Sequence, residues 1–96
     1  MPPEFSSPRP NVYVGDTGFS VEILGRAGLR YAESGKVMII DSEVLALPGH
    51  MALFRESITR WEAPHEEEPV HEVDRQRIIA NIGGAFRSQG FVLEVL

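Results

Sequence analysis

Residues 74–89 constrain the fold most, because their apolar side chains repeat at the spacing of one helical face. The stripe consists of Ile78, Ile79, Ile82, Ala85 and Phe86. Gly90 follows directly and is suited to end a helix in the left-handed conformation. A glycine inside a helix costs about 1 kcal/mol relative to alanine. We therefore expect Gly83 and Gly84 to serve a close approach of the helix backbone to a sheet.

The residues upstream of this helix predict an antiparallel meander over residues 19–41. Residues 19–23 and 29–33 alternate apolar and polar side chains, as half-buried strands do. Residues 37–40 form a continuous apolar run, which we expect to be the most buried strand. Combining the strand and helix periodicities predicts a core. Its members are Val21, Ile23, Tyr31, Val37, Ile39, Ile78, Ile82 and Phe86.

Together these patterns predict an α+β fold, in which an antiparallel β-meander sheet packs against one C-terminal helix. Residues 91–96 predict a final C-terminal strand, and residues 57–61 predict a single helical turn. Residues 1–10 contain four prolines and predict a flexible Pro-rich tail, because proline fixes φ and lacks an amide donor. No second core is visible, so we expect residues 11–96 to form a single α+β domain.

The composition limits the choice of cellular compartment and of partner class. The 96-residue chain has no cysteine, which excludes disulfides and thiolate metal sites and favours a reducing compartment. The N-terminus lacks the pattern of a signal peptide, and no apolar stretch approaches the roughly 18 residues of a membrane span. We therefore expect a cytoplasmic location and no membrane partner. The net charge of −5 disfavours nucleic acid, which needs clustered lysine and arginine, and suits a basic protein partner.

The sequence contains no recognisable catalytic motif. No serine lies in a G-x-S-x-G nucleophile elbow, and the glycines within residues 15–18 have no following lysine to bind phosphate. His65 and His71, with the acids around them, are of the types that bind zinc. They lack the i, i+4 spacing of a zinc-binding helix, and nearby prolines are expected to keep the segment extended. We therefore expect no enzyme activity and no cofactor, with metal binding by the His65–His71 loop as the less favoured alternative.

The most concentrated negative charge lies within residues 62–74, which contain six acids. Prolines flank Glu66, Glu67 and Glu68 and limit the freedom of the chain there. Trp61 precedes the acids, and its indole suits either a core anchor, which we favour, or an interface hot spot. We predict that all four residues lie at or beside a partner-binding face. The alternative is an acidic loop that is merely solvated.

Residues 19–96 also carry short motifs in a distinctive order and spacing. These are Ile40-Asp41-Ser42-Glu43, Pro48-Gly49-His50-Met51, Ser57-Ile58, Trp61, Pro64, Arg77-Ile78-Ile79, Asn81-Ile82, Ala85-Phe86 and Gly90-Phe91. With this order, the chain resembles the immunity protein 74 family of bacterial polymorphic-toxin systems. The resemblance implies a small domain that neutralises a toxin by binding it, without a cofactor. None of the motifs is catalytic, and the resemblance implies no particular contact residues.

We therefore interpret the chain as a non-catalytic binding protein, and its partner as a basic toxin domain. Toxins that act on nucleic acids carry basic surfaces, and an acidic inhibitor would be steered toward such a surface by long-range electrostatics. The alternative, a function of another class, is a structural or regulatory role for a small cytoplasmic domain that has no toxin partner.

Overall fold

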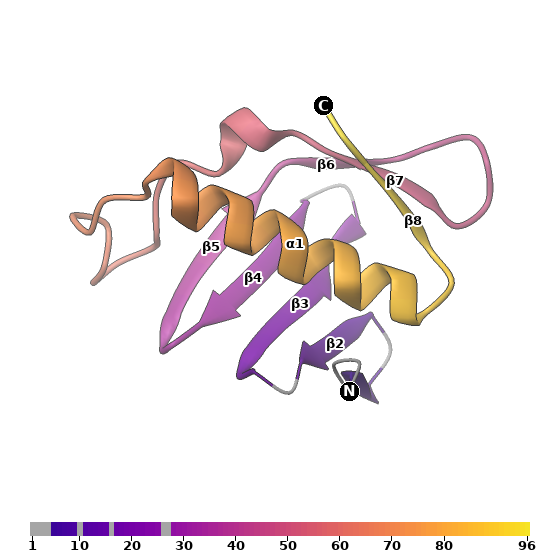
Figure 1. The fold of residues 1–96 in the computed structure, drawn as a ribbon, viewed down its shortest axis with the longest axis horizontal. Coiled ribbons are helices and arrows are strands. Elements are labelled where there is room, and N and C mark those ends of the chain that lie inside the picture. The colour runs from indigo at the N-terminus through magenta and orange to yellow at the C-terminus, as the bar shows by residue number, and fades with distance from the viewer. Residues whose placement is uncertain (1–4, 10, 16, 26–27) are drawn as a thin grey trace.

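The computed structural model describes residues 5–9, 11–15, 17–25 and 28–96, which form two sheets and one long helix (Figure 1). In chain order, the elements are β1 (Phe5–Arg9), β2 (Val12–Gly15), β3 (Phe19–Ile23), β4 (Leu29–Glu33), β5 (Lys36–Ile40), β6 (Ser42–Val44), β7 (His50–Leu53), a short 3-10 helix (Arg55–Ser57), α1 (Glu72–Ser88) and β8 (Val92–Val95). This arrangement confirms the predicted α+β class, with one C-terminal helix and a final strand. Among the described residues, no helix is long and apolar enough to cross a membrane.

The larger sheet is an antiparallel meander of five strands in the order β1-β2-β3-β4-β5. It confirms the meander predicted over residues 19–41 and extends it by two strands at the N-terminal side. The register places Val21 opposite Tyr31, and Tyr31 opposite Met38. Because directly opposed residues point to the same face of a sheet, these three side chains share one face across β3, β4 and β5.

The expected Pro-rich tail contains a strand. Residues 1–4 and 10 lie outside the described part of the chain, and the residues between them form β1 at the edge of the meander. Pro8 lies within β1, and an edge strand tolerates proline because one side of its backbone pairs with no other strand. The pairing register with β2 shifts between Ser6 and Arg9, around this proline.

Helix α1 covers one face of the meander, and the core lies between them (Figure 1). Its buried members are Tyr13, Phe19, Val21, Leu29, Tyr31, Met38, Ile40, Met51, Leu53, Ile58, Trp61, Ile78, Ile82, Ala85 and Phe86. The burial predicted for Val21, Tyr31 and the three core residues of the helix is confirmed. Ile23, also predicted to be a core residue, is only partly buried.

The prediction for β5 is wrong, because this strand is buried on one face only. Met38 and Ile40 are fully buried, whereas Val37 is half-buried and Ile39 is 39% exposed. Side chains of successive strand residues point to opposite faces, and the α1 helix covers the face that Met38 shares with Tyr31. An unbroken apolar run does not reveal which of its alternate residues face the core.

The end of α1 positions the last strand. Gly90 adopts a φ of +79°, which confirms its predicted left-handed conformation. Its amide donates to the Arg87 carbonyl over 3.1 Å, and the Phe91 amide donates to the Phe86 carbonyl over 2.9 Å. These two bonds form a Schellman motif, and the rings of Phe86 and Phe91 meet edge-to-face with centroids 5.9 Å apart. The chain thereby leaves the helix in a fixed direction, toward β8.

The smaller sheet has the order β6-β7-β8, with β6 and β7 antiparallel and β7 and β8 parallel. Parallel pairing requires a long crossover, and α1 lies within the crossover from β7 to β8. Helix α1 faces β8 at Gly83, where an added Cβ would lie 4.0 Å from Leu93 Cδ2. This is an ordinary contact distance, so the prediction that glycine serves a close backbone approach is wrong at Gly83.

Candidate functional site

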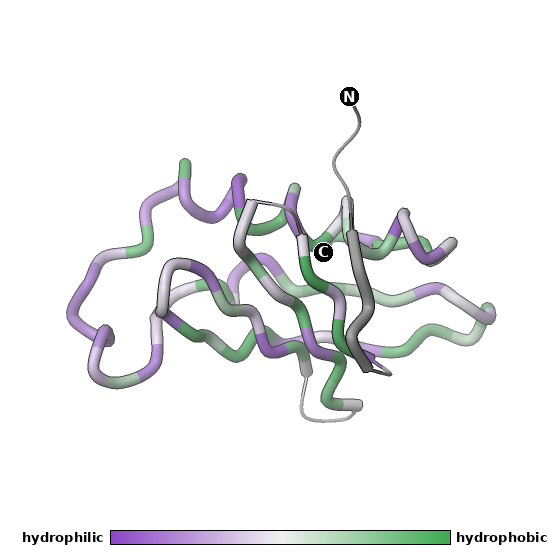
Figure 2. Tube along the Cα trace, turned by 90° about the horizontal axis from the view of Figure 1, so that it is seen from below, coloured by the Kyte–Doolittle hydropathy of each residue, from purple (hydrophilic) through white to green (hydrophobic). Residues whose placement is uncertain are grey.

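The acidic loop, residues 62–71, precedes α1 and lies at one end of the molecule, where the trace in Figure 2 is largely hydrophilic. The Glu62 amide donates to the Val37 carbonyl over 2.7 Å, which ties the loop to the edge of the meander. The His65 amide then donates to the Glu62 carbonyl over 2.9 Å, and the Glu68 amide to the His65 carbonyl over 3.0 Å. The loop therefore folds into two successive turns, and the expectation that prolines keep it extended is wrong.

Trp61 lies in the core beneath the acidic loop. It is 2% exposed, and its ring centroid lies 6.4 Å from that of Tyr31. Lys36 Nζ lies 4.8 Å from the indole centroid and 3.6 Å from Glu68 Oε1, so it joins a cation–π contact to an ion pair. The favoured interpretation of Trp61 as a core anchor is confirmed. Its part in partner binding stays a prediction, and it would be indirect, through the position of Lys36 and the loop.

The three glutamates of the loop are all exposed but differ in their surroundings. Glu68 is engaged within the molecule, by Lys36 and by His65 Nδ1, which lies 2.7 Å from Glu68 Oε2. Within the described ranges, no hydrogen bond or ion pair engages the carboxylates of Glu66 and Glu67. These two charges are therefore available to a partner, and the charge of Glu68 is partly offset.

Hydrogen bonds at the start of α1 fix a second group of acids. The His71 amide donates to Asp74 Oδ2 over 2.9 Å, and the His71 side chain accepts from the Asp74 amide, which completes a capping box. The bonds from the His71 backbone and from Arg77 lower the pKa of Asp74. Arg77 also donates to both carboxylate oxygens of Glu33 over 2.8 and 3.0 Å, and these bonds raise the pKa of Arg77. The sequence patterns did not predict this contact, which joins α1 to β4.

Arginine side chains offset the charge of Glu72, the first residue of α1. Arg75 binds the Glu72 carboxylate from one turn further along the helix. Arg55 Nη2, from the 3-10 helix, lies 3.3 Å from Glu72 Oε1. Since Glu72 is compensated in this way, the loop carboxylates that no described residue engages are those of Glu62, Glu66 and Glu67.

The two histidines of the metal-binding alternative have separate local partners. His65 lies at hydrogen-bond distance from Glu68, and His71 caps α1 together with Asp74. In the part of the chain that the structure describes, no three His, Cys, Asp or Glu side chains come together as metal ligands. The geometry therefore gives the metal-binding alternative no support.

Tyr31 places a titratable hydroxyl in the core beneath α1. Its side chain is fully buried, and Asn81 Nδ2 on the helix donates to Tyr31 Oη over 2.8 Å. Burial raises the pKa of Tyr31 to about 12. A proton donor or acceptor is most effective when its pKa lies near the working pH, so this phenol is suited to joining helix and sheet and not to acid–base chemistry near pH 7.

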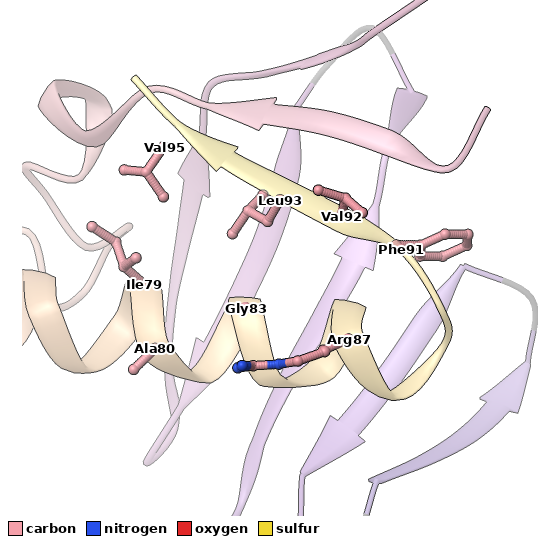
Figure 3. Close-up of a pocket in the computed structure, with 8 residues that line it drawn as sticks. All are labelled: Ile79, Ala80, Gly83, Arg87, Phe91, Val92, Leu93 and Val95. Atoms are coloured by element: carbon pink, nitrogen blue, oxygen red, sulfur yellow. The ribbon is translucent and has the colours of Figure 1, made fainter. Parts of the chain in front are cut away.

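A groove between α1 and β8, the α1–β8 groove, is the second surface feature (Figure 3). It encloses about 420 Å³ and is lined by Ile79, Ala80, Gly83, Arg87, Phe91, Val92, Leu93 and Val95. Ile79, Gly83 and Arg87 are four residues apart and so share one face of the helix. Among the described residues of the lining, Arg87 contributes the only charged side chain. The groove was not predictable from the sequence patterns, because it depends on the position of β8 after the crossover.

The described residues thus define a small α+β domain whose candidate functional site consists of surfaces, the acidic loop and the α1–β8 groove. A model of the family immunity protein 74 matches residues 20–96. The chain belongs to this family, as its motifs predicted. No curated protein and no solved structure matches the chain.

Proposed function

We propose that this protein neutralises a toxin by binding it directly. The observation that carries the proposal is the match to an immunity protein family over residues 20–96. Neutralisation by binding needs no chemistry from the inhibitor, since a bound protein can cover a toxin's working surface. The protein acts in the cytoplasm, and its lack of cysteine fits such a reducing compartment.

The partner is a basic toxin domain, and the acidic loop lies at or beside the face that meets it. The net charge of −5 supports this choice, and so do the carboxylates of Glu66 and Glu67, which no described residue engages. Charges at the rim of an interface steer a partner of opposite sign and mainly raise the association rate. Glu68 contributes less to this field because Lys36 offsets it, while Lys36 and Trp61 hold the base of the loop in position.

The probe for the proposed function is a toxin domain found in a neighbouring gene or by pull-down from the native cell. Cells that make this domain should survive when they also make the protein, and the two purified proteins should form a stable complex. If the protein neither protects such cells nor binds the toxin domain, the proposal is wrong. A toxin domain from an unrelated immunity system serves as the control, and it should neither bind nor be neutralised.

The role of the acidic loop in binding is tested by comparing two double variants that remove the same amount of charge. The loop variant combines Glu66→Gln and Glu67→Gln, and the control variant combines Asp41→Asn and Glu43→Gln. All four carboxylates are exposed and have no partner among the described residues, and each variant removes two negative charges, which changes the net charge from −5 to −3. The measurement is the association rate with the toxin domain at low and at high ionic strength.

We expect the loop variant to associate several-fold more slowly than the control variant at low salt. The difference should shrink at high salt, because the Debye length falls to about 3 Å at 1 M. Equal association rates for the two variants at low salt would remove the loop from the interface. The exposed face of the meander around Arg30 and Glu22 would then be the next surface to test.

A further inference from the structure

The two sheets end in four edge strands, of which three are protected against pairing with another chain. Edge strand β1 contains Pro8 and a shift in register between Ser6 and Arg9. Along β5, the Val37 carbonyl is already bonded to the Glu62 amide of the acidic loop. Strand β6 has only three residues. Strand β8 has no proline, no lysine and no covering segment hydrogen-bonded to its outer edge among the described residues.

The backbone of β8 offers hydrogen-bonding groups on the side away from β7. The amides of Val92 and Leu96 each donate over 2.8 Å to carbonyls of the β7 segment, so they point toward that strand. In an extended strand, successive residues direct their amide and carbonyl groups to opposite edges. The amides and carbonyls of Leu93 and Val95 therefore point to the outer edge, where no described strand pairs with β8.

The α1–β8 groove lies beside this edge. Figure 3 shows β7 on one side of β8 and the groove-lining face of α1 on the other, with Leu93 and Val95 directed toward the helix. Val92 is 45% exposed and Val95 is 41% exposed, so apolar surface accompanies the open edge. The groove lacks the several convergent polar groups that orient a small molecule. Its lining is better matched to apolar side chains of another chain.

Arg87 gives the groove a charge of its own. Its side chain is exposed, and within the described ranges no acid forms an ion pair with it. The other arginines near the helix, Arg55, Arg75 and Arg77, are all paired with acids of this chain. An unpaired guanidinium beside an open strand edge complements a carboxylate on an incoming segment.

We propose that β8 accepts an extended segment of the toxin as an additional strand, with apolar side chains in the α1–β8 groove and an acidic side chain on Arg87. This inference rests on the proposed function and names the surface and the kind of partner segment. In strand addition, main-chain hydrogen bonds supply affinity, and pockets for alternate side chains supply specificity. Here the main chain of Leu93 and Val95 would supply the hydrogen bonds, and the groove would supply the pockets for side chains.

Val95→Pro is the most direct test of the edge. Proline at this position removes the amide that points outward and leaves the hydrogen bonds between β8 and β7 in place, as an edge strand allows. Val95→Thr is the matched control, because threonine keeps the amide and the preference for strands. We expect the toxin complex of Val95→Pro to dissociate about tenfold faster or more, since interface changes act mainly on the dissociation rate. Val95→Thr should have a smaller effect.

A second pair of variants tests the groove without changing the strand. Gly83→Met fills the groove from the helix side, where an added Cβ meets only Leu93 Cδ2 at 4.0 Å. Gln76→Met is its control, because Gln76 is exposed on the same helix and does not line the groove. Gly83→Met should weaken the complex and Gln76→Met should not. The fluorescence of Trp61 and the circular dichroism spectrum establish that each variant is folded.

Amide hydrogen exchange measures the proposed pairing of β8 with the toxin segment directly. In the free protein, the amides of Leu93 and Val95 should exchange faster than those of Val92 and Leu96, and the toxin domain should protect them. If the wild type binds and both Val95→Pro and Gly83→Met bind equally well, the inference alone is overturned. If the wild type does not bind the toxin domain, the proposed function fails and the inference fails with it. A dimer of this protein that Val95→Pro abolishes, with toxin binding unchanged, would assign the edge to a second copy and overturn the inference.

Discussion

Replacing Met38 with alanine should destabilise the protein far more than replacing its neighbour Ile39. Met38 is fully buried on the face of β5 that α1 covers, whereas Ile39 is 39% exposed on the other face. A buried Met→Ala substitution costs about 2–5 kcal/mol, because transfer free energy is lost and a cavity remains. Full burial of an isoleucine contributes about 1.5–3 kcal/mol, so truncating a partly exposed one without leaving a cavity costs about 1 kcal/mol. The expected difference in unfolding free energy between the two variants is therefore at least about 1 kcal/mol.

Urea titration followed by the fluorescence of Trp61 measures this difference. Trp61 is the only tryptophan and is 2% exposed, so unfolding moves its indole from the core into water. The slope of free energy against urea should stay constant between variants, because they unfold to the same extent. Each kcal/mol of lost unfolding free energy should also lower the melting temperature by about 4–8 °C in a domain of this size. Equal losses for Met38→Ala and Ile39→Ala, or a larger loss for Ile39→Ala, would refute the register of β5 and the position of α1 over it.

Gly83→Ala should raise the free energy of unfolding by up to about 1 kcal/mol, because alanine favours the helix and its Cβ would lie 4.0 Å from the nearest neighbouring side chain. A lower free energy of unfolding in the same urea titration would mean that α1 and β8 lie too close together for the added methyl group. Burial raises the pKa of Tyr31 from 10.0 to about 12, so the unfolded chain releases this proton first and stability should fall as pH rises from 10.0 to about 12. Titrations across this range should show that Tyr31→Phe removes that part of the decline, and an unchanged decline would contradict the assignment.

The sequence predicted best those features that depend on neighbouring residues. The helical stripe has a clear period, and a helix buries one face whatever it packs against. The end of α1 is equally local, because Gly90 and Phe91 bond to carbonyls of the last helical turns. The helix begins at Glu72, two residues before the predicted start, where the capping box lies among residues that had been assigned to the loop.

Features that depend on distant residues were not predictable in this way. The apolar run of β5 shows that a strand is present, but pairing with β4 decides that Met38 and not Ile39 faces the core. The sequence shows that the loop is acidic, but it does not show that Lys36 pairs with Glu68. That ion pair depends on the bond from the Glu62 amide to the Val37 carbonyl, which holds the loop beside β5. The α1–β8 groove requires the parallel pairing of β7 with β8, which no local pattern specifies.

The two proposed contact surfaces would act at different stages of binding, because their interactions differ in range. The charges of Glu66 and Glu67 act over about 8 Å at physiological salt, so they influence a toxin before it docks. Hydrogen bonds to the edge of β8 and apolar contacts in the groove form only at contact, so they act on how long the complex lasts. A salt dependence confined to association, together with edge variants that change dissociation, is therefore the kinetic pattern that this division requires. The two proposals can also be tested independently, because the loop variant is judged by the association rate and the edge variants by the dissociation rate.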